Sequence, residues 1–389
     1  MGNFHPLTML TFALTGQNPF VLHATNIALH CATAVVLFLL LRELSGSVPA
    51  ACAGALLWAV HPLRTESVAW IADRVDLLCG LFYTAALLAY VRQRRWLTVA
   101  LFLLALLSKA MAVTFPLALL AIDFLQGRRA LREKAPFFAL SVVFGIVGLV
   151  ARRGPGALPV LPGFAFSPLA KIALSCRALL LYLGNLLFPL RLSALYAYPK
   201  ALTWNDWLAP LFVAAVAAIA WWSARLTRTV AFAFLFFFVS IAIVLPVVSI
   251  GHTFAADRYT YIPSIGFAYA VAMLLKHVPR ASIAAAVAAV LFGVMSFQRT
   301  QVWHDSVSLW SSVIDADPDV AMAYNNRAAA LTERHDVAAT VRDLDRALAL
   351  DPCYGTALRN RTIAAVSSGD QATARRLALQ HRRCQSGAP

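Results

Sequence analysis

The chain has 389 residues, of which 60% are hydrophobic and only 13% charged, and it carries a formal net charge of +15. This composition excludes an ordinary soluble domain, which contains about 25% charged residues, and it also excludes a disordered chain. The basic excess lies in residues 1–297, with 22 Lys and Arg against 8 Asp and Glu, whereas residues 298–389 hold 11 against 10. Basic residues that bracket apolar runs are typical of membrane topology, so we expect contact with membrane lipid and no nucleic-acid partner.

The ratio of Arg to Lys indicates the kind of organism and membrane. Arg outnumbers Lys by 28 to 5, which is typical of a GC-rich bacterial genome and indicates a bacterial inner membrane. Residues 1–16 lack the basic segment that opens a cleavable signal peptide. We therefore expect the chain to begin as if inside a longer protein.

Ten apolar stretches are long enough, or nearly long enough, for the roughly 20 residues that a membrane-spanning helix needs. They are residues 21–41, 50–60, 77–91, 97–107, 112–125, 137–150, 207–222, 230–248, 265–275 and 283–297. An eleventh stretch, 167–190, is apolar but contains Lys171 and Arg177. Four cysteines in apolar runs lack the spacing of a metal site and are interpreted as core residues: Cys31, Cys52, Cys79 and Cys176.

The topology follows from the short basic connections. Residues 92–95, 128–134, 225–228 and 276–280 are rich in Arg and Lys, and the positive-inside rule places them in the cytoplasm. An even number of crossings must separate the second connection from the third. Residues 137–150 and 207–222 already supply two crossings between these connections, so we expect residues 167–190 to lie at the outer surface. Ten spans then place the start of the chain and its polar tail in the periplasm.

The tail contains a repeat. Asp317-Pro318 recurs as Asp351-Pro352 at an interval of 34 residues, which is the period of the tetratricopeptide (TPR) helical hairpin. The pattern predicts helices over 305–316, 321–333, 337–350, 355–367 and 371–383. Cys353 and Cys384 flank one predicted hairpin, so a disulfide is expected if the tail lies outside the cytosol. We therefore predict an all-α chain, with a polytopic membrane helix bundle over 1–297 and a short TPR solenoid over 298–389.

Three predicted outer connections carry ionisable residues at the edge of apolar runs, where such residues are functional by default. The first is residues 61–76, with His61, Arg64, Glu66, Arg74 and Asp76. Its arginines suit an anionic phosphate, and its carboxylates suit a hydroxyl proton or a divalent cation. The alternative, to which we give equal weight, is that these residues only form salt bridges with one another within a turn.

The second connection contains Lys109, and the third contains Arg258, Tyr259 and Tyr261. An arginine beside aromatic rings can bind a phosphate and stack on a sugar. A helix cap at Lys109 and a fixed helix entry at Pro263 are the structural alternatives. Together the three connections fit a phosphorylated lipid that carries a sugar better than they fit an ion.

Residues 6–14, 61–76, 108–114, 188–193 and 257–264, followed by the repeats, resemble the transmembrane and TPR-containing (TMTC-like) O-mannosyltransferase group and its bacterial relatives. The resemblance implies a GT-C type glycosyltransferase that uses a polyprenyl-phosphate sugar and a protein or glycan acceptor. It implies that Arg64, Glu66, Arg74, Asp76, Lys109 and Arg258 line the site. Together with the residue pattern, we predict Glu66 and Asp76 as catalytic residues and His61, Arg64, Arg74, Lys109, Arg258, Tyr259 and Tyr261 as substrate-binding residues. No cofactor is implied with certainty, although the carboxylates are compatible with a divalent metal.

Two departures from the family pattern shape the expected function. The chain begins where the first outer loop of the family ends, so the first helix and the catalytic acid of that loop are expected to be missing. Ala110 also follows Lys109 where relatives usually have Glu, and His5 stands where Arg is common. Two hypotheses follow: a glycosyltransferase, active or inactive, that works on the outer face of the membrane, and a non-catalytic scaffold that displays TPR repeats to partners.

Overall fold

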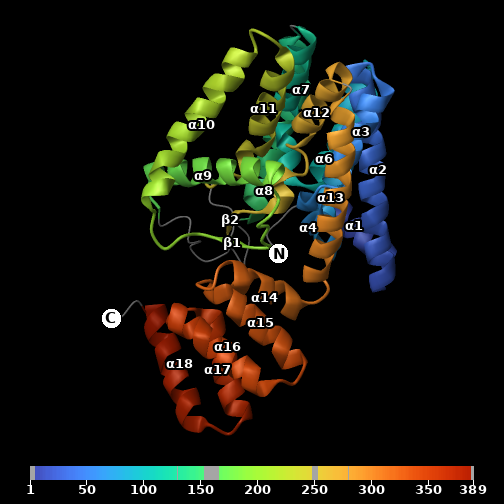
Figure 1. Ribbon diagram of the computed structural model, residues 1–389. Coiled ribbons are helices and arrows are strands. Elements are labelled where there is room, and N and C mark those ends of the chain that lie inside the picture. Colours follow the sequence, from blue (N-terminus) through green and yellow to red (C-terminus); the bar gives the residue numbers. More distant parts are fainter. Residues whose placement is uncertain (1–4, 129, 153–165, 248–252, 279, 387–389) are drawn as a thin grey trace. The chain divides into compact units, whose positions relative to one another are not determined.

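The computed structural model describes residues 5–128, 130–152, 166–247, 253–278 and 280–386, and its described part is almost entirely helical (Figure 1). It divides into two compact units. Unit 1 comprises Met1–Leu192 and Tyr196–Arg299, and unit 2 comprises Ser193–Leu195 and Thr300–Pro389. The all-α polytopic fold predicted from the sequence is confirmed.

Unit 1 contains α1 to α12 and most of α13. The helices are α1 (Pro6–Thr15), α2 (Pro19–Ser45), α3 (Val48–Ala59), α4 (Thr65–Ala69), α5 (Arg74–Val91), α6 (Arg95–Ser108), α7 (Phe115–Gln126), α8 (Ala135–Arg152), α9 (Pro168–Leu187), α10 (Trp204–Ser223), α11 (Arg228–Ile241), α12 (Ile265–His277) and α13 (Ala281–Val302). Short 3₁₀ segments join several of them: η1 (Pro62–Arg64), η2 (Ile71–Asp73), η3 (Ala110–Thr114), η4 (Leu131–Lys134), η6 (Ala242–Val244) and η7 (Asp257–Thr260). Each of the ten predicted apolar stretches falls largely within one of these helices.

Six helical segments of the described residues are long and apolar enough to cross a bilayer, and six shorter apolar helices accompany them. The chain is therefore a multi-pass membrane protein. Helices predominate because no water is available in hydrocarbon to hydrogen bond an open backbone. Helix α2 shows how the sequence sets its ends: Asn18 caps its first turn by accepting the Phe20 N–H at 2.9 Å, and Gly46 ends it in the left-handed conformation.

The core of unit 1 surrounds α5. Its Tyr83 packs edge-on against Phe115 of α7, at 5.1 Å between ring centroids, and Phe115 stacks on Phe102 of α6 at 4.6 Å. Small residues allow other helices to approach closely, as in many membrane proteins. A Cβ atom on Gly266 of α12 would lie 2.7 Å from the carbonyl oxygen of Ala233 in α11.

Helix α9 covers residues 168–187 of the stretch that we expected at the outer surface. It is also long and apolar enough to span a membrane. In Figure 1 it runs across the direction of α7, α11 and α12, beside the two-stranded antiparallel sheet of β1 (Tyr196–Ala197) and β2 (Thr253–Ala255). The outer-surface position of this helix therefore stays a prediction.

Unit 2 consists of consecutive helical hairpins. Its helices are α14 (Ser306–Ala316), α15 (Ala321–Glu333), α16 (Val337–Leu350), α17 (Gly355–Ser367) and α18 (Gln371–Ser386). Asp336 and Asp370, 34 residues apart, each accept a backbone N–H at 3.0 Å in the first turn of the following helix. Buried alanines such as Ala328, Ala347 and Ala357 allow neighbouring helices to pack closely.

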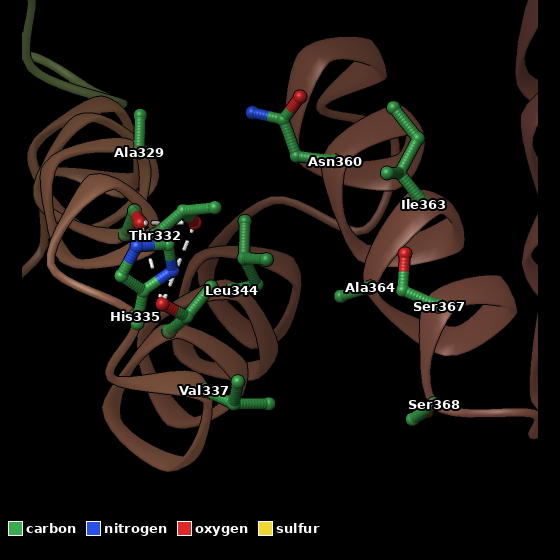
Figure 2. Close-up of a pocket in the computed structure, with 12 residues that line it drawn as sticks. Ala329, Thr332, His335, Val337, Leu344, Asn360, Ile363, Ala364, Ser367 and Ser368 are labelled. Carbon is green, nitrogen blue, oxygen red and sulfur yellow. Dashed lines mark hydrogen bonds between the residues drawn. The ribbon is translucent and has the colours of Figure 1, made fainter.

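Cys353 and Cys384 form a disulfide with their Cα atoms 5.5 Å apart, which links the start of α17 to the end of α18. A groove of about 570 Å³ lies beside the first hairpin of unit 2. Figure 2 shows Asn360, Ile363 and Ser367 of α17 on one side of it, opposite Ala329, Thr332 and Leu344. The groove is lined by apolar residues, by the hydroxyl groups of Thr and Ser, and by His335 and Asn360.

Candidate functional site

Two buried ion pairs lie in the connections of unit 1. The connection from α3 to α5 folds as η1, α4 and η2, and it packs against η7, which precedes α12. Lys109 lies between α6 and η3. Because several short helical segments converge here, residues from three connections meet at one end of the bundle.

The first ion pair joins Glu66 of α4 to Arg258 of η7. The Glu66 carboxylate accepts a hydrogen bond from the Arg258 guanidinium, and its Oε2 accepts the backbone N–H of Arg258 at 3.0 Å. Burial lowers the pKa of Arg258, but the Glu66 charge outweighs this effect and raises it well above its ordinary value. Arg258 is therefore a permanent cation whose side chain remains 17% exposed.

The second ion pair joins Asp76, in the first turn of α5, to Lys109. The Lys109 side chain is 19% exposed, whereas that of Asp76 is buried. Burial lowers the pKa of Lys109, and the carboxylates of Asp76 and Asp73 outweigh burial and raise it. Asp73 and Asp76 interact electrostatically, and the Oδ2 atom of each is buried without a hydrogen-bond partner among the described residues.

Aromatic rings connect the two pairs. Tyr259 lies beneath both cations, with its ring centroid 4.9 Å from the Arg258 guanidinium carbon and 5.4 Å from the Lys109 nitrogen. Trp70, a residue that we did not single out from the sequence, lies 5.3 Å from Arg258 and is 41% exposed. The arrangement combines two reachable cations with an exposed aromatic face.

Arg64 lies in a deeper layer. Its Nη2 donates to Thr260 Oγ1 at 2.7 Å, and its guanidinium packs over the rings of Trp58 and Tyr261 at 5.4 and 5.3 Å. Its Nε and Nη1 atoms have no hydrogen-bond partner among the described residues. Burial lowers the pKa of Arg64 to about 10, so it remains charged at neutral pH.

Three other predicted site residues make contacts that favour a structural role. Arg74 is fully buried and donates to Asn26 Oδ1, Thr15 Oγ1 and the Leu22 carbonyl at 3.0, 2.9 and 3.2 Å. His61 Nδ1 accepts the Leu63 N–H, so its Nε2–H donates to the Leu186 carbonyl at 3.0 Å.

Burial lowers the pKa of His61 to about 3, which keeps its ring neutral. The Tyr261 hydroxyl lies 2.8 Å from His30 Nδ1, inside the bundle. The polar atoms of Arg74, His61 and Tyr261 thus bond to residues outside the Glu66–Arg258 and Asp76–Lys109 pairs.

Asp257 is a buried carboxyl that we did not select, although it precedes Arg258 in the sequence. Its Oδ1 accepts the Tyr196 hydroxyl at 2.9 Å and the Asn185 amide at 3.4 Å. Burial and the nearby charge of Glu66 raise its pKa to about 7. Its position in an Asp-Arg-Tyr run beside an apolar helix was the available signal.

The described residues include no group of three or more His, Cys, Asp and Glu side chains that is placed to hold a metal ion. The unpartnered oxygens of Asp73 and Asp76 are the nearest approach to a cation site at this end of unit 1. They supply two ligands where a divalent ion takes six or more oxygens, so any metal here needs oxygens from water or substrate.

Comparison with known proteins connects this architecture to a family. Residues 5–150 match the model of the dolichyl-phosphate-mannose-protein mannosyltransferase family. Protein O-mannosyl-transferase Tmtc2 of Drosophila melanogaster is 30% identical over 215 residues, which cover 49% of this chain and 23% of that protein. Protein O-mannosyl-transferase TMTC1 of Homo sapiens is 43% identical over 95 residues, which cover 23% of this chain and 11% of that protein.

A protein O-mannosyl-transferase of Caenorhabditis elegans is 26% identical over 379 residues, covering 90% of this chain and 54% of that protein. The resemblance to the TMTC-like O-mannosyltransferase group is confirmed. The chain spans at most about half the length of these curated relatives. No solved structure matches the chain.

The family match covers only part of this candidate site. Glu66, Asp76 and Lys109 lie within the matched residues 5–150, whereas Arg258 and Tyr259 lie outside them. The fold joins the two parts, because the Glu66–Arg258 pair spans 192 positions of the sequence.

Proposed function

We propose that the chain is a membrane glycosyltransferase that transfers a sugar from a polyprenyl-phosphate donor to a hydroxyl group of a protein acceptor. The observation that carries the proposal is the pair of buried cation–carboxylate contacts, Glu66 with Arg258 and Asp76 with Lys109, around the ring of Tyr259. The names of the relatives support the substrate class. The outer face of a bacterial inner membrane is the proposed location of the reaction.

The exposure of the side chains suggests how the roles are divided. Arg258 and Lys109 are reachable, whereas Glu66 and Asp76 are buried behind them. A phosphate that approaches from outside therefore meets the two cations first. Positioned cations of this kind stabilise negative charge that develops on a leaving group.

In the proposed reaction, the bond from the anomeric carbon to the donor phosphate oxygen breaks while a bond to the acceptor oxygen forms. The departing phosphate takes the bonding electrons and is stabilised by Arg258 and Lys109. The acceptor hydroxyl loses its proton to a carboxylate, which acts as a general base.

Asp76 is better placed for this proton than Glu66. Glu66 accepts hydrogen bonds from both the backbone and the guanidinium of Arg258, so its role is to position that cation. Asp76, with Asp73 beside it, keeps one oxygen without a partner among the described residues. The exposed face of Trp70 is available to stack on a sugar ring.

For unit 2 we propose a role in binding the protein acceptor or a partner, as predicted for TPR repeats. Its groove, shown in Figure 2, carries the side chains of Thr332, Asn360 and Ser367, which can hydrogen bond a peptide. The same groove supports the second candidate function, a scaffold whose membrane unit is not catalytic.

Sugar transfer by membranes that contain the chain tests the proposal, with a radiolabelled polyprenyl-phosphate sugar as donor. We expect Arg258→Ala and Lys109→Ala each to lower kcat/KM by about 100-fold or more. Asp76→Asn should lower kcat by a similar factor. Arg177→Gln is the matched control, because Arg177 also pairs with a carboxylate, Asp206 at 2.9 Å, but packs over the ring of Phe254 and not over that of Tyr259. Label transfer that is equal in all four variants, or absent from the wild type, would favour the scaffold.

A further inference from the structure

A polar pocket lies at the end of α5 and α6 that is opposite to Asp76 and Lys109. Asp76 and Tyr90 are 14 positions apart on α5, or about 21 Å at the rise of an α-helix. Helix α6 likewise ends beside Lys109 and begins at Arg95.

The pocket has a volume of about 240 Å³ and is lined by Tyr90, Gln93, Arg94, Arg95, Thr98, Glu133 and Phe137. The Arg94 carbonyl accepts the Thr98 hydroxyl at 3.0 Å, but the exposed guanidinium groups of Arg94 and Arg95 form no hydrogen bond or ion pair with another described residue. The neighbouring Arg92 differs, because it is held by Glu43 at 2.7 Å. The pocket therefore contains two guanidinium groups that are free to bind a ligand.

The base of the pocket is preorganised. Tyr90 donates its hydroxyl to Asp123 at 2.6 Å, and the fully buried Lys134 pairs with the same carboxylate. Arg128 packs over the Tyr90 ring at 5.5 Å and donates to Gln93 Oε1 at 3.3 Å. Gln93 ends α5 in the left-handed conformation, with a φ of 60°, and the Arg94 N–H donates back to the Ala89 carbonyl at 2.9 Å.

The charge balance favours an anion. Asp123 is neutralised by Lys134, so Glu133 is the carboxylate that opposes Arg94, Arg95 and Arg128. The first turn of α6 adds backbone N–H groups without a side-chain cap. Guanidinium groups with free backbone donors match the oxygens of a phosphate ester.

We propose that this pocket binds a phosphate ester, and that its source is the headgroup of an anionic phospholipid. Trp96 and Leu97 follow Arg95 and are 82% and 52% exposed, and exposed tryptophans are typical of the membrane–water interface. Phe137 adds an apolar wall. Basic pockets between membrane helices bind lipid headgroups at the cytoplasmic side, where the positive-inside rule places residues 92–95.

Native mass spectrometry of the delipidated chain in nonionic detergent tests the proposal. The chain is titrated in separate arms with phosphatidylglycerol, with phosphatidylcholine and with inorganic phosphate. We expect one phosphatidylglycerol to bind at least about tenfold more tightly than phosphatidylcholine, because the zwitterionic headgroup carries an opposing cation. Binding of inorganic phosphate alone would overturn the lipid assignment.

Variants separate the pocket from general surface charge. Arg94→Gln with Arg95→Gln should weaken phosphatidylglycerol binding about tenfold or more. Arg225→Gln with Arg280→Gln removes the same charge from other basic connections and should leave binding unchanged. Glu133→Gln removes the carboxylate that opposes these arginines and should tighten phosphatidylglycerol binding severalfold. Misfolding cannot explain this result, because a misfolded protein would bind the lipid less tightly. Equal losses in both double variants would overturn the proposal, as would weaker binding by Glu133→Gln.

Discussion

At the residue scale, the three arginines of the predicted outer connections differ in what surrounds them. Arg258 has a carboxylate partner and a reachable side chain, and Arg74 is enclosed by α1 and α2. Two nitrogens of Arg64 have no hydrogen-bond partner within the part of the chain that the structure describes. The sequence alone made Arg64 and Arg74 equivalent, because both stand in one short polar segment. The decisive partners of Arg74, such as Asn26, lie 48 positions away, and no local pattern identifies them.

Arg74→Ala is expected to lower the free energy of unfolding by about 3 kcal/mol, because the buried Asn26 side chain and the Leu22 carbonyl lose a donor. Thermal unfolding in detergent measures this loss. Arg225→Ala, at an exposed position, is the control and should change stability by less than about 0.5 kcal/mol. An Arg74→Ala protein as stable as the control, but inactive, would reassign Arg74 to substrate binding.

The buried carboxyl of Asp257 predicts a pH-dependent stability. Its pKa is raised from 3.8 to about 7, so the folded chain holds this proton more tightly than the unfolded chain does. The stabilisation is complete below about pH 4 and is lost as the pH rises to about 7. Asp257→Asn can still accept the Tyr196 hydroxyl, and it should be more stable than the wild type above pH 7, by on the order of 4 kcal/mol. A stability difference between the two proteins that is constant from pH 4 to pH 8 would contradict this prediction.

At the element scale, the sequence predicted helices well and their long-range contacts poorly. The bounds of α15, α16 and α17 match the prediction, because aspartates and Asp-Pro steps mark the ends of each helix. The membrane helices were found from their apolar runs. The 3₁₀ segments η1, η2 and η7 were not predicted, and they are the segments that turn Glu66 and Arg258 toward each other.

Gly266 tests the close packing of α11 and α12. Gly266→Ala should destabilise unit 1 by about 1–3 kcal/mol, because the new methyl group meets the Ala233 carbonyl oxygen at 2.7 Å. Gly145→Ala in α8 is the matched control, since no atom of another described element lies within 4 Å of its added Cβ atom. Thermal unfolding of both variants measures the difference, and equal stabilities would show that the two helices separate without cost.

At the scale of the whole molecule, unit 1 has two polar ends of different character. One end carries the Glu66–Arg258 and Asp76–Lys109 pairs, and the other carries the basic pocket at Arg94 and Arg95. The proposed function needs the first end to face the periplasm, where a lipid-linked sugar and a protein acceptor meet. The disulfide of unit 2 agrees with an oxidising compartment, because such bonds are rare in the cytosol.

Cysteine labelling in intact cells tests this central claim most directly. In a background with Cys31, Cys52 and Cys176 replaced by Ala, the exposed Trp70 and Trp96 are changed singly to Cys. A membrane-impermeant maleimide should label Trp70→Cys from outside and should label Trp96→Cys only after the cells are permeabilised. The reverse pattern would place the paired cations and carboxylates in the cytoplasm and contradict the account.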